Sequence, residues 1–308
     1  MICHYTAPLG VRTENESRCD RFFVGEEEAG DRLDRILARR LGISRAQARA
    51  LILAGQVWLE RGRAEPAARL EAGTAVEVHW EGPGLKPTPF PIPILYEDGD
   101  VVVVNKPRGL PVHPVGRMCG PTVVTALLAC GPLAGGDPQR PGVVHRLDAP
   151  VTGVMVLTRT AAAHASLVRQ FKERKVKKEY LAVVEGEVEV EAGAIEGRVG
   201  RDPHAPWRMG LQAGGKEART EFTVLARAQG RSLLLVRPRT GRTHQIRLHL
   251  GAIGHPVVGD PFYGKGGGPL LLHAWRLGFL HPRDGGWREF AAPPPPEFSF
   301  WLEGRGSS

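Results

Sequence analysis

Hydrophobic and polar positions first follow a helical period along this chain of 308 residues. Within residues 31–41 the apolar side chains recur three, four and eight positions apart, which places them on one helix face. Gly42 predicts the end of this helix, and Ser44 predicts the N-cap of a second helix that runs to Ala54. Short strands are expected near residues 57–59 and 75–80. The pattern therefore predicts a small α+β module over residues 21–80.

A proline-rich segment separates this module from the rest of the chain. Residues 81–93 contain five prolines and two glycines, which predicts a stiff linker rather than helix or sheet. Further strands are expected near residues 94–96, 101–104, 153–158, 179–185, 218–226 and 231–237, and helices near 121–129, 160–174, 242–253 and 297–302. Because the strands come in blocks with few helices between them, we expect an α+β fold for residues 94–303, with a mixed, largely antiparallel sheet and flanking helices. Residues 1–20 and 304–308 are expected to form an N-terminal extension and a tail.

Charge and composition narrow the possible partners. A net charge of +8 and a pI of about 9.6 favour a polyanionic partner. No apolar run approaches the roughly 18 residues that cross a bilayer, and residues 1–20 lack the apolar core of a secretory signal. We therefore expect a cytoplasmic protein without a membrane partner. The four cysteines form no C-x-x-C pair and the histidines no H-E-x-x-H pattern, so no metal site is expected.

The first module concentrates positive charge. Residues 31–50 carry six arginines against two aspartates, a net charge of +4, on two adjoining predicted helices. Such a face suits structured RNA, although on charge alone a solvated helix surface is the favoured interpretation. The candidate RNA contacts on this face are Arg32, Arg35, Arg39, Arg45 and Arg49.

A candidate catalytic carboxylate lies in the second domain. Residues 141–158 read P-G-V-V-H-R-L-D-A-P-V-T-G-V-M-V-L-T, in which an expected strand delivers Asp148 into a turn and a second apolar strand leaves it. A carboxylate at a strand–loop junction is rigidly held yet reachable from solvent. The alternative, an aspartate that only caps the turn, is favoured by these residues taken by themselves.

Several blocks of the sequence resemble one enzyme family. The segment H-R-L-D-A-P-V-T-G resembles the H-R-L-D-x-x-T-S-G motif of the RluA family of pseudouridine synthases. Matching blocks occur in order before and after it: G-L-P-V-H-P (109–114), K-K-E-Y-L-A-V-V-E-G (177–186), R-T-G-R-T-H-Q-I-R-L-H-L (239–250), G-H-P-V-V-G-D-P-F-Y-G (254–264) and L-L-H-A (271–274). Residues 31–57 resemble the small RNA-binding domain named after the fourth small-subunit ribosomal protein. The resemblance implies an α+β RNA pseudouridine synthase, an isomerase with this RNA-binding domain at its N-terminal end.

Three departures from the family pattern are visible. Ala149 stands where a basic residue is usual, and Val151-Thr152 replaces Thr-Ser, although Thr152 keeps a hydroxyl. In the first module, residues 58–62 replace the usual V-N-G. These differences concern the shape of two turns and leave the implied reaction unchanged.

The resemblance also assigns roles to individual residues. Asp148 would be the catalytic carboxylate, and Arg247 would pair with it and keep it ionised. Tyr180 would stack on the flipped uracil, with its hydroxyl available for proton removal from C5, and Arg146 would fill the place that the base leaves. Isomerisation adds no group and oxidises nothing, so no cofactor is expected. Further candidate RNA contacts are Arg242 and His244, together with Lys175 and Lys177 of the basic segment 169–178.

The expected partner is large-subunit ribosomal RNA, with transfer RNA as the alternative, and the protein is expected to be a monomer. Rival interpretations are a catalytically silent RNA-binding or ribosome-assembly protein, a DNA-binding factor and a metal-dependent nuclease. The presence of Asp148 argues against the first rival, and the lack of a recognition-helix motif or clustered carboxylates argues against the other two.

Overall fold

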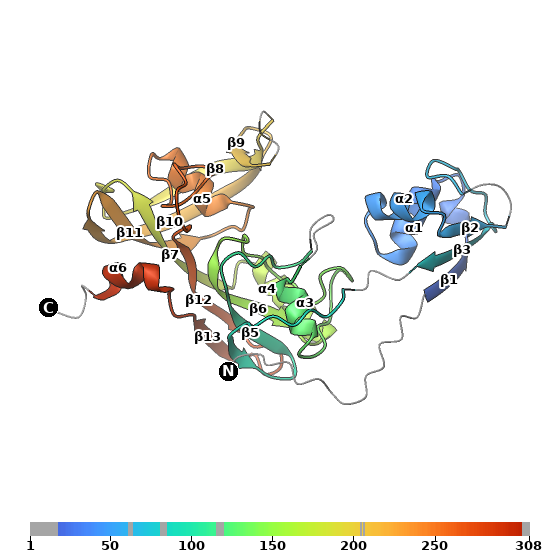
Figure 1. Cartoon of the computed structure of the whole chain (residues 1–308), viewed down its shortest axis with the longest axis horizontal. Coiled ribbons are helices and arrows are strands. Elements are labelled where there is room, and N and C mark those ends of the chain that lie inside the picture. Colours follow the sequence, from blue (N-terminus) through green and yellow to red (C-terminus); the bar gives the residue numbers. More distant parts are fainter. Residues whose placement is uncertain are drawn as a thin grey trace. The chain divides into compact units, whose positions relative to one another are not determined.

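The structure, a computed structural model, describes residues 18–60, 64–80, 85–114, 120–203, 205 and 207–303. The chain divides into two compact units, a smaller one formed mainly by the chain up to Lys86 and a larger one that begins at Pro87. Each unit has its own sheet and helices (Figure 1). Most of the expected extension, part of the expected linker and the tail lie outside the described residues.

The smaller unit is built from two helices and a three-stranded antiparallel sheet of order β1-β3-β2, which confirms the expected α+β module. Its elements are β1 (Arg18–Phe23), the 3-10 helix η1 (Glu26–Glu28), α1 (Leu33–Leu41), α2 (Arg45–Leu53), β2 (Val57–Leu59) and β3 (Ala75–Trp80). Gly42 ends α1 in the left-handed conformation, and Ser44 caps α2 in a reciprocal pair with Gln47. Strand β1 was not expected, and it begins within the predicted extension.

The larger unit is built around a ten-stranded sheet of order β4-β5-β6-β12-β7-β11-β10-β8-β9, with β13 paired to β12. Its strands are β4 (Ile94–Glu97), β5 (Val101–Lys106), β6 (Thr152–Thr158), β7 (Lys177–Glu185), β8 (Ala192–Arg201), β9 (Met209–Leu211), β10 (Lys216–Ala228), β11 (Arg231–Pro238), β12 (Leu272–Leu280) and β13 (Trp287–Ala291). Its helices are α3 (Val123–Leu128), α4 (Ala161–Lys172), α5 (Gln245–Ala252), the 3-10 helix η2 (Pro296–Phe298) and α6 (Ser299–Glu303). The β6–β12 pair is parallel and the other pairs are antiparallel. The predicted mixed, largely antiparallel sheet is confirmed.

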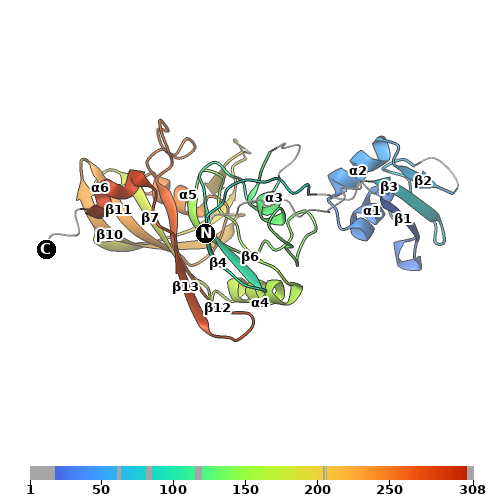
Figure 2. The same cartoon turned by 60° about the horizontal axis from the view of Figure 1, so that its bottom comes forward.

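Helices cover both faces of this sheet. Figure 2 shows α4 beside β6 and β12, while α6 lies over the β7–β11 part of the sheet. Trp301 of α6 packs with Leu181 of β7 in one apolar cluster. Because successive side chains of a strand point to opposite faces, Tyr180 points to the face that α6 does not cover. The side chains with candidate chemistry collect on this second face.

Four strands of the larger unit were not predicted, namely β8, β9, β12 and β13. Strand β8 contains three glycines and three charged residues among its ten, and β9 has three residues, so neither carries a strong apolar signal. Strand β12 lies in the centre of the sheet, paired on both sides. Strand β12 depends on pairing with β6 and β7, which lie far from it in the sequence, and local patterns do not encode such pairing.

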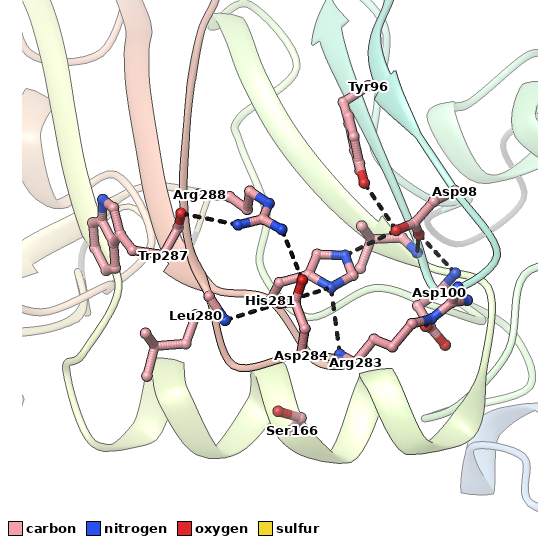
Figure 3. A network of polar contacts seen from close by, with 12 residues as sticks. Tyr96, Asp98, Asp100, Ser166, Leu280, His281, Arg283, Asp284, Trp287 and Arg288 are labelled. Atoms are coloured by element: carbon pink, nitrogen blue, oxygen red, sulfur yellow. Dashed lines mark hydrogen bonds and ion pairs between the residues drawn. The ribbon is translucent and has the colours of Figure 1, made fainter.

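A polar network ties the β4–β5 turn to the β12–β13 hairpin (Figure 3). His281 is buried, with its Nε2 3.0 Å from Oδ2 of Asp98, and Asp98 also accepts from the hydroxyl of Tyr96 at 2.9 Å. Arg283 donates to Asp100 at 2.7 Å in the same turn. The network fixes one edge of the sheet.

No helix in the described part of the chain has the length and apolarity that a membrane span requires.

Candidate active site

A pocket of about 950 Å³ opens in the larger unit on the Tyr180 face of the sheet. Three segments far apart in the sequence line it: the Val144–Asp148 loop, the end of α4 with the turn after it, and the loop that leads into α5. Strand β7 supplies Tyr180 to its wall. The pocket is therefore assembled by the fold and belongs to no single motif.

The loop that carries Asp148 is held by hydrogen bonds to its backbone. No regular strand leads into it, contrary to expectation, and an isolated bridge between Val143 and Leu157 takes its place. Nζ of the buried Lys106 donates to three carbonyl oxygens, those of Pro107, Leu110 and Ala149, each at 2.9 Å. Three acceptors match the three hydrogens of an ammonium group and fix the residue that follows Asp148.

A histidine fixes the other side of the same loop. Nε2 of His145 accepts a hydrogen bond from the backbone N–H of Val156 at 3.1 Å, and its ring stacks on Phe171 at 4.8 Å between centroids. Burial, reinforced by the charge of Lys178, lowers the pKa of His145 to about 3, so the ring is neutral. This neutral state agrees with its role as an acceptor.

The departures from the family motif have a structural explanation in this loop. Ala149 takes part in this turn through its backbone: its carbonyl oxygen accepts hydrogen bonds from Nζ of Lys106 and from the backbone N–H of Gly109. The hydroxyl of Thr152 pairs with Nδ1 of His273 at 2.8 Å, and both side chains are buried. The backbone and one hydroxyl therefore supply the contacts that hold the turn.

The buried guanidinium of Arg247 bonds to both Asp148 and Asp260. Nη1 of Arg247 donates to Oδ2 of Asp148 at 3.1 Å, while Nε and Nη2 of Arg247 donate to the two oxygens of Asp260 at 2.7 and 2.8 Å. Arg247 is 2% exposed and Asp260 is fully buried, whereas the Asp148 side chain is 16% exposed and lines the pocket. The arrangement leaves Asp148 as the carboxylate that a ligand can reach.

Arg247 and Asp260 stabilise each other's charged form. Burial opposes ionisation of Asp260, but the bonds from Arg247 and from the backbone amides of Phe262 and Tyr263 hold the pKa of Asp260 below its usual value. Burial likewise opposes the charge on Arg247, yet its two carboxylate partners raise the pKa of Arg247. The guanidinium is thus a fixed cation beside Asp148.

Tyr180 lines the pocket near Asp148. Burial, together with the negative charge of Asp148, raises the pKa of Tyr180, so its hydroxyl stays protonated. A half-buried neutral aromatic ring at a pocket wall offers a flat apolar surface, which suits stacking against a planar base.

The other residues that the sequence singled out divide into two groups. Arg146, Arg242, His244 and Lys177 line the pocket, with Arg146 exposed and His244 lying 3.8 Å from Asp148. Lys175 does not line it and forms an ion pair with Glu173 at 2.8 Å.

In the smaller unit most of the candidate arginines are already paired. Asp34 lies 3.0 Å from Arg32 and 3.2 Å from Arg45, and its side chain is 2% exposed. Asp31 similarly pairs with Arg35 and Arg39. Arg49 has no carboxylate partner within the part of the chain that the structure describes.

Sequence reasoning overlooked Lys106, His145, Asp260 and Tyr263 as site residues. Asp260 and Tyr263 lie in the G-D-P-F-Y-G block, and His145 lies in the H-R-L-D block, so the signal was present without a role. Lys106 precedes a proline at the end of β5, where nothing local distinguishes it from a solvated lysine. No group of three or more His, Cys, Asp or Glu side chains within the described ranges has the arrangement of a metal site.

Comparisons with known proteins agree on one family. The sequence model of RNA pseudouridylate synthases matches residues 100–252, and that of the S4 domain matches residues 31–76. An uncharacterised RNA pseudouridine synthase of Aquifex aeolicus is 41% identical, over 91% of this chain and 95% of the relative. The ribosomal large subunit pseudouridine synthase D of Neisseria meningitidis serogroup A is 39% identical, over 92% of this chain and 80% of the relative. Among solved structures, human RNA Pseudouridylate Synthase Domain Containing 1 is similar with a TM-score of 0.56 and 29% identity, over 66% of this chain and 84% of that one.

Proposed function

Since this chain belongs to the RNA pseudouridylate synthase family, we propose that it isomerises specific uridines of large-subunit ribosomal RNA with Asp148 as the catalytic carboxylate. The enzyme is an isomerase, and its S4 domain is an RNA-binding module. The observation that carries the catalytic assignment is the position of Asp148, which faces the pocket while Arg247 and Asp260 behind it are buried. A carboxylate that only capped a turn would not need a buried cation held by a second carboxylate.

In this proposal the pocket receives a uridine that has left its stack. Leaving the stack costs a few kcal/mol. Protein contacts to the flipped nucleotide, and to the gap that it leaves in the RNA stack, offset this cost. Tyr180 stacks on the uracil, and the exposed Arg146 takes the position of the base in the RNA. Arg247 holds the Asp148 carboxylate in position toward the nucleotide.

The phosphates around the flipped nucleotide would meet the basic rim of the pocket. Lys177 and Arg242 lie at this rim, and Nε of Arg242 donates to the carbonyl oxygen of Glu217 at 3.1 Å, which orients its side chain. Such contacts fix the register of the RNA without reading its sequence. Lys175 lies off the pocket and would contact more distant phosphates.

The choice of ribosomal RNA rests on the accessory unit and on one relative. A second RNA-binding unit on the same chain raises the effective concentration of its contacts, which suits a large folded RNA with helices beside the target. The Neisseria meningitidis relative is named for the large ribosomal subunit. Transfer RNA is the alternative substrate.

Mapping pseudouridines in cellular RNA from strains with and without the gene tests this function. The proposal expects one or a few uridines of large-subunit RNA to lose the modification, and expression of the wild-type chain but not of Asp148→Asn to restore it. Loss confined to transfer RNA would reject the ribosomal assignment, and full restoration by Asp148→Asn would remove Asp148 from the mechanism.

A further inference from the structure

Isomerisation of uridine requires a proton to leave C5, because the glycosidic bond moves from N1 to C5 and the product carries a proton on N1. This requirement holds whichever bond Asp148 acts on first. After the base has rotated, C5 occupies the place that N1 left, next to C1′ of the ribose. The group that removes the proton must therefore lie near Asp148 and must be able to accept a proton.

His244 lies at that place. It occupies the N-cap of α5 with a backbone φ of 54°, in the left-handed region that non-glycine residues rarely adopt. This conformation brings its Nε2 to 3.8 Å from Oδ2 of Asp148, and its side chain is 14% exposed. Its ring stacks on Phe262 at 5.7 Å between centroids and an interplanar angle of 29°. Local strain at a residue that lines a pocket is typical of a functional position.

Hydrogen bonds select the tautomer of this ring. Nδ1 of His244 pairs with the hydroxyl of Tyr263 at 3.1 Å. That hydroxyl donates its one hydrogen to the carbonyl oxygen of Met209 at 3.1 Å and accepts from the backbone N–H of Met209 at 3.0 Å. The hydroxyl oxygen is therefore an acceptor toward His244, so Nδ1 carries the ring hydrogen. Nε2 then keeps its lone pair on the side of Asp148.

The surrounding charges leave the ring able to accept a proton. Burial lowers the pKa of His244, Asp148 and Asp260 oppose this effect, and Arg247 and Arg146 add to it. The ring is neutral at neutral pH.

Other groups near Asp148 are less suited to accept the proton. Burial lowers the pKa of Lys106 to about 7, but its Nζ faces three carbonyl oxygens and does not line the pocket. Arg247 is a permanent cation. The hydroxyl of Tyr180 is held protonated by burial. A protonated phenol is a much weaker base than a neutral imidazole.

We propose that His244 is the general base that removes the C5 proton through Nε2. This proposal rests on the function proposed above, in which Asp148 is the catalytic carboxylate. Once C5 has bonded to C1′, the C5–H bond breaks and its proton passes to Nε2. The electron pair restores the C5=C6 double bond and leaves negative charge on N1. N1 takes a proton from water or from the His244 imidazolium, so the reaction is an isomerisation without a net gain or loss of protons.

The test compares two substrates that differ at C5. Unmodified transcripts of bacterial large-subunit RNA are prepared with tritium at C5 of uridine, or with 5-fluorouridine in place of uridine. Tritium released into water measures C5 deprotonation, and mass spectrometry of digested RNA measures conversion of 5-fluorouridine. Fluorinated substrate has no C5 proton to remove, so it reports the steps up to the new carbon–carbon bond. Single-turnover conditions with the full-length enzyme separate these steps from binding.

His244→Asn is the main variant, because asparagine tolerates the left-handed backbone but lacks a basic nitrogen. We expect it to slow tritium release by roughly 10²- to 10⁴-fold, the usual contribution of a general base, and to convert 5-fluorouridine at the wild-type rate. His244→Gln is expected to do the same. The matched control is His255→Asn, since His255 is a half-buried histidine of the same unit that lies off the pocket. It should leave both rates unchanged.

Equal slowing of both substrates would assign His244 to binding or structure, and normal tritium release would remove it from the reaction. Either result overturns this inference while the proposed function stands. A wild-type chain that releases no tritium from the transcript overturns the proposed substrate and this inference together.

Discussion

Asp260 is predicted to control both the stability of the larger unit and the catalytic step, although it does not line the pocket. The perturbation is Asp260→Asn, which is nearly isosteric but removes the charge. In the native chain the two oxygens of Asp260 accept from Nε and Nη2 of Arg247 and from the backbone N–H groups of Phe262 and Tyr263. Asparagine has one oxygen and an amide NH₂, so at least one of the two Arg247 bonds becomes a clash between donors.

The size of the effect follows from burial. Breaking a buried ion pair by removing one partner costs about 3–5 kcal/mol, because the remaining charge stays desolvated. Asp148 still faces Nη1 of Arg247 and offsets part of this cost, so we expect about 3 kcal/mol. For a unit of this size each 1 kcal/mol lowers Tm by roughly 2–4 °C, which gives a decrease of roughly 6–12 °C. The guanidinium of Arg247, no longer held by Asp260, should also turn toward Asp148 and shift the Asp148 carboxylate from its position in the pocket.

Urea unfolding of the wild-type and variant full-length chains measures the free energy, and single-turnover tritium release measures the chemistry. Asp284→Asn is the control, since Asp284 pairs with Arg288 at 2.7 Å but is half exposed. Exposed ion pairs contribute little, so this variant should behave as the wild type in both assays. If Asp260→Asn unfolds within 1 kcal/mol of the wild type and reacts at the normal rate, the argument that Asp260 holds Arg247 in place is refuted.

Four further outcomes are expected. Asp148→Asn should fold normally but lose several orders of magnitude in turnover, as measured by tritium release and checked by circular dichroism. Lys106→Met should cost roughly 2–4 kcal/mol in urea unfolding, because three carbonyl oxygens lose their donor. Arg49→Ala should weaken RNA binding and lower the slope of log affinity against log salt by about one, with the ion-paired Arg45 changed to alanine as the comparison. Activity should persist below the ordinary histidine pKa and fall only at more acidic pH, because burial lowers the pKa of His244 and its neutral form is the base; a pH–rate profile that falls already near pH 6.5 would contradict this.

The parts of the fold that the sequence predicted are those with local causes. The two helices of the smaller unit were predicted because Gly42 and Ser44 mark their boundaries through backbone and capping effects within one turn. Strands β8 and β13 were missed because about half of their residues face solvent, so their apolar pattern is weak although each pairs with a strand close by in the sequence. Local patterns therefore gave the helices more completely than the sheet.

The same distinction applies to the site. Asp148 and Arg247 are 99 residues apart in the chain, and only the family resemblance paired them in advance. Asp260 lies within one of the sequence blocks that match the family, but its role depends on a contact with Arg247 of α5 that no spacing rule predicts. The role of Lys106 could not be predicted from the sequence, because a lysine at the end of a strand usually lies in solvent, whereas this one is 1% exposed.

The arginines of the smaller unit show why counting charges along a sequence overstates a binding surface. The net charge of +4 over residues 31–50 is correct as a sum, but Asp31 and Asp34 engage four of the six arginines. Arg40, a fifth, pairs with the buried Glu28 at 2.7 Å, just outside the counted segment. These carboxylates fix the guanidinium groups in place, and each phosphate that approaches must compete with a carboxylate already in contact. We therefore expect this unit to recognise the shape of a folded RNA through arginines in fixed positions, with a salt dependence smaller than six free arginines would give.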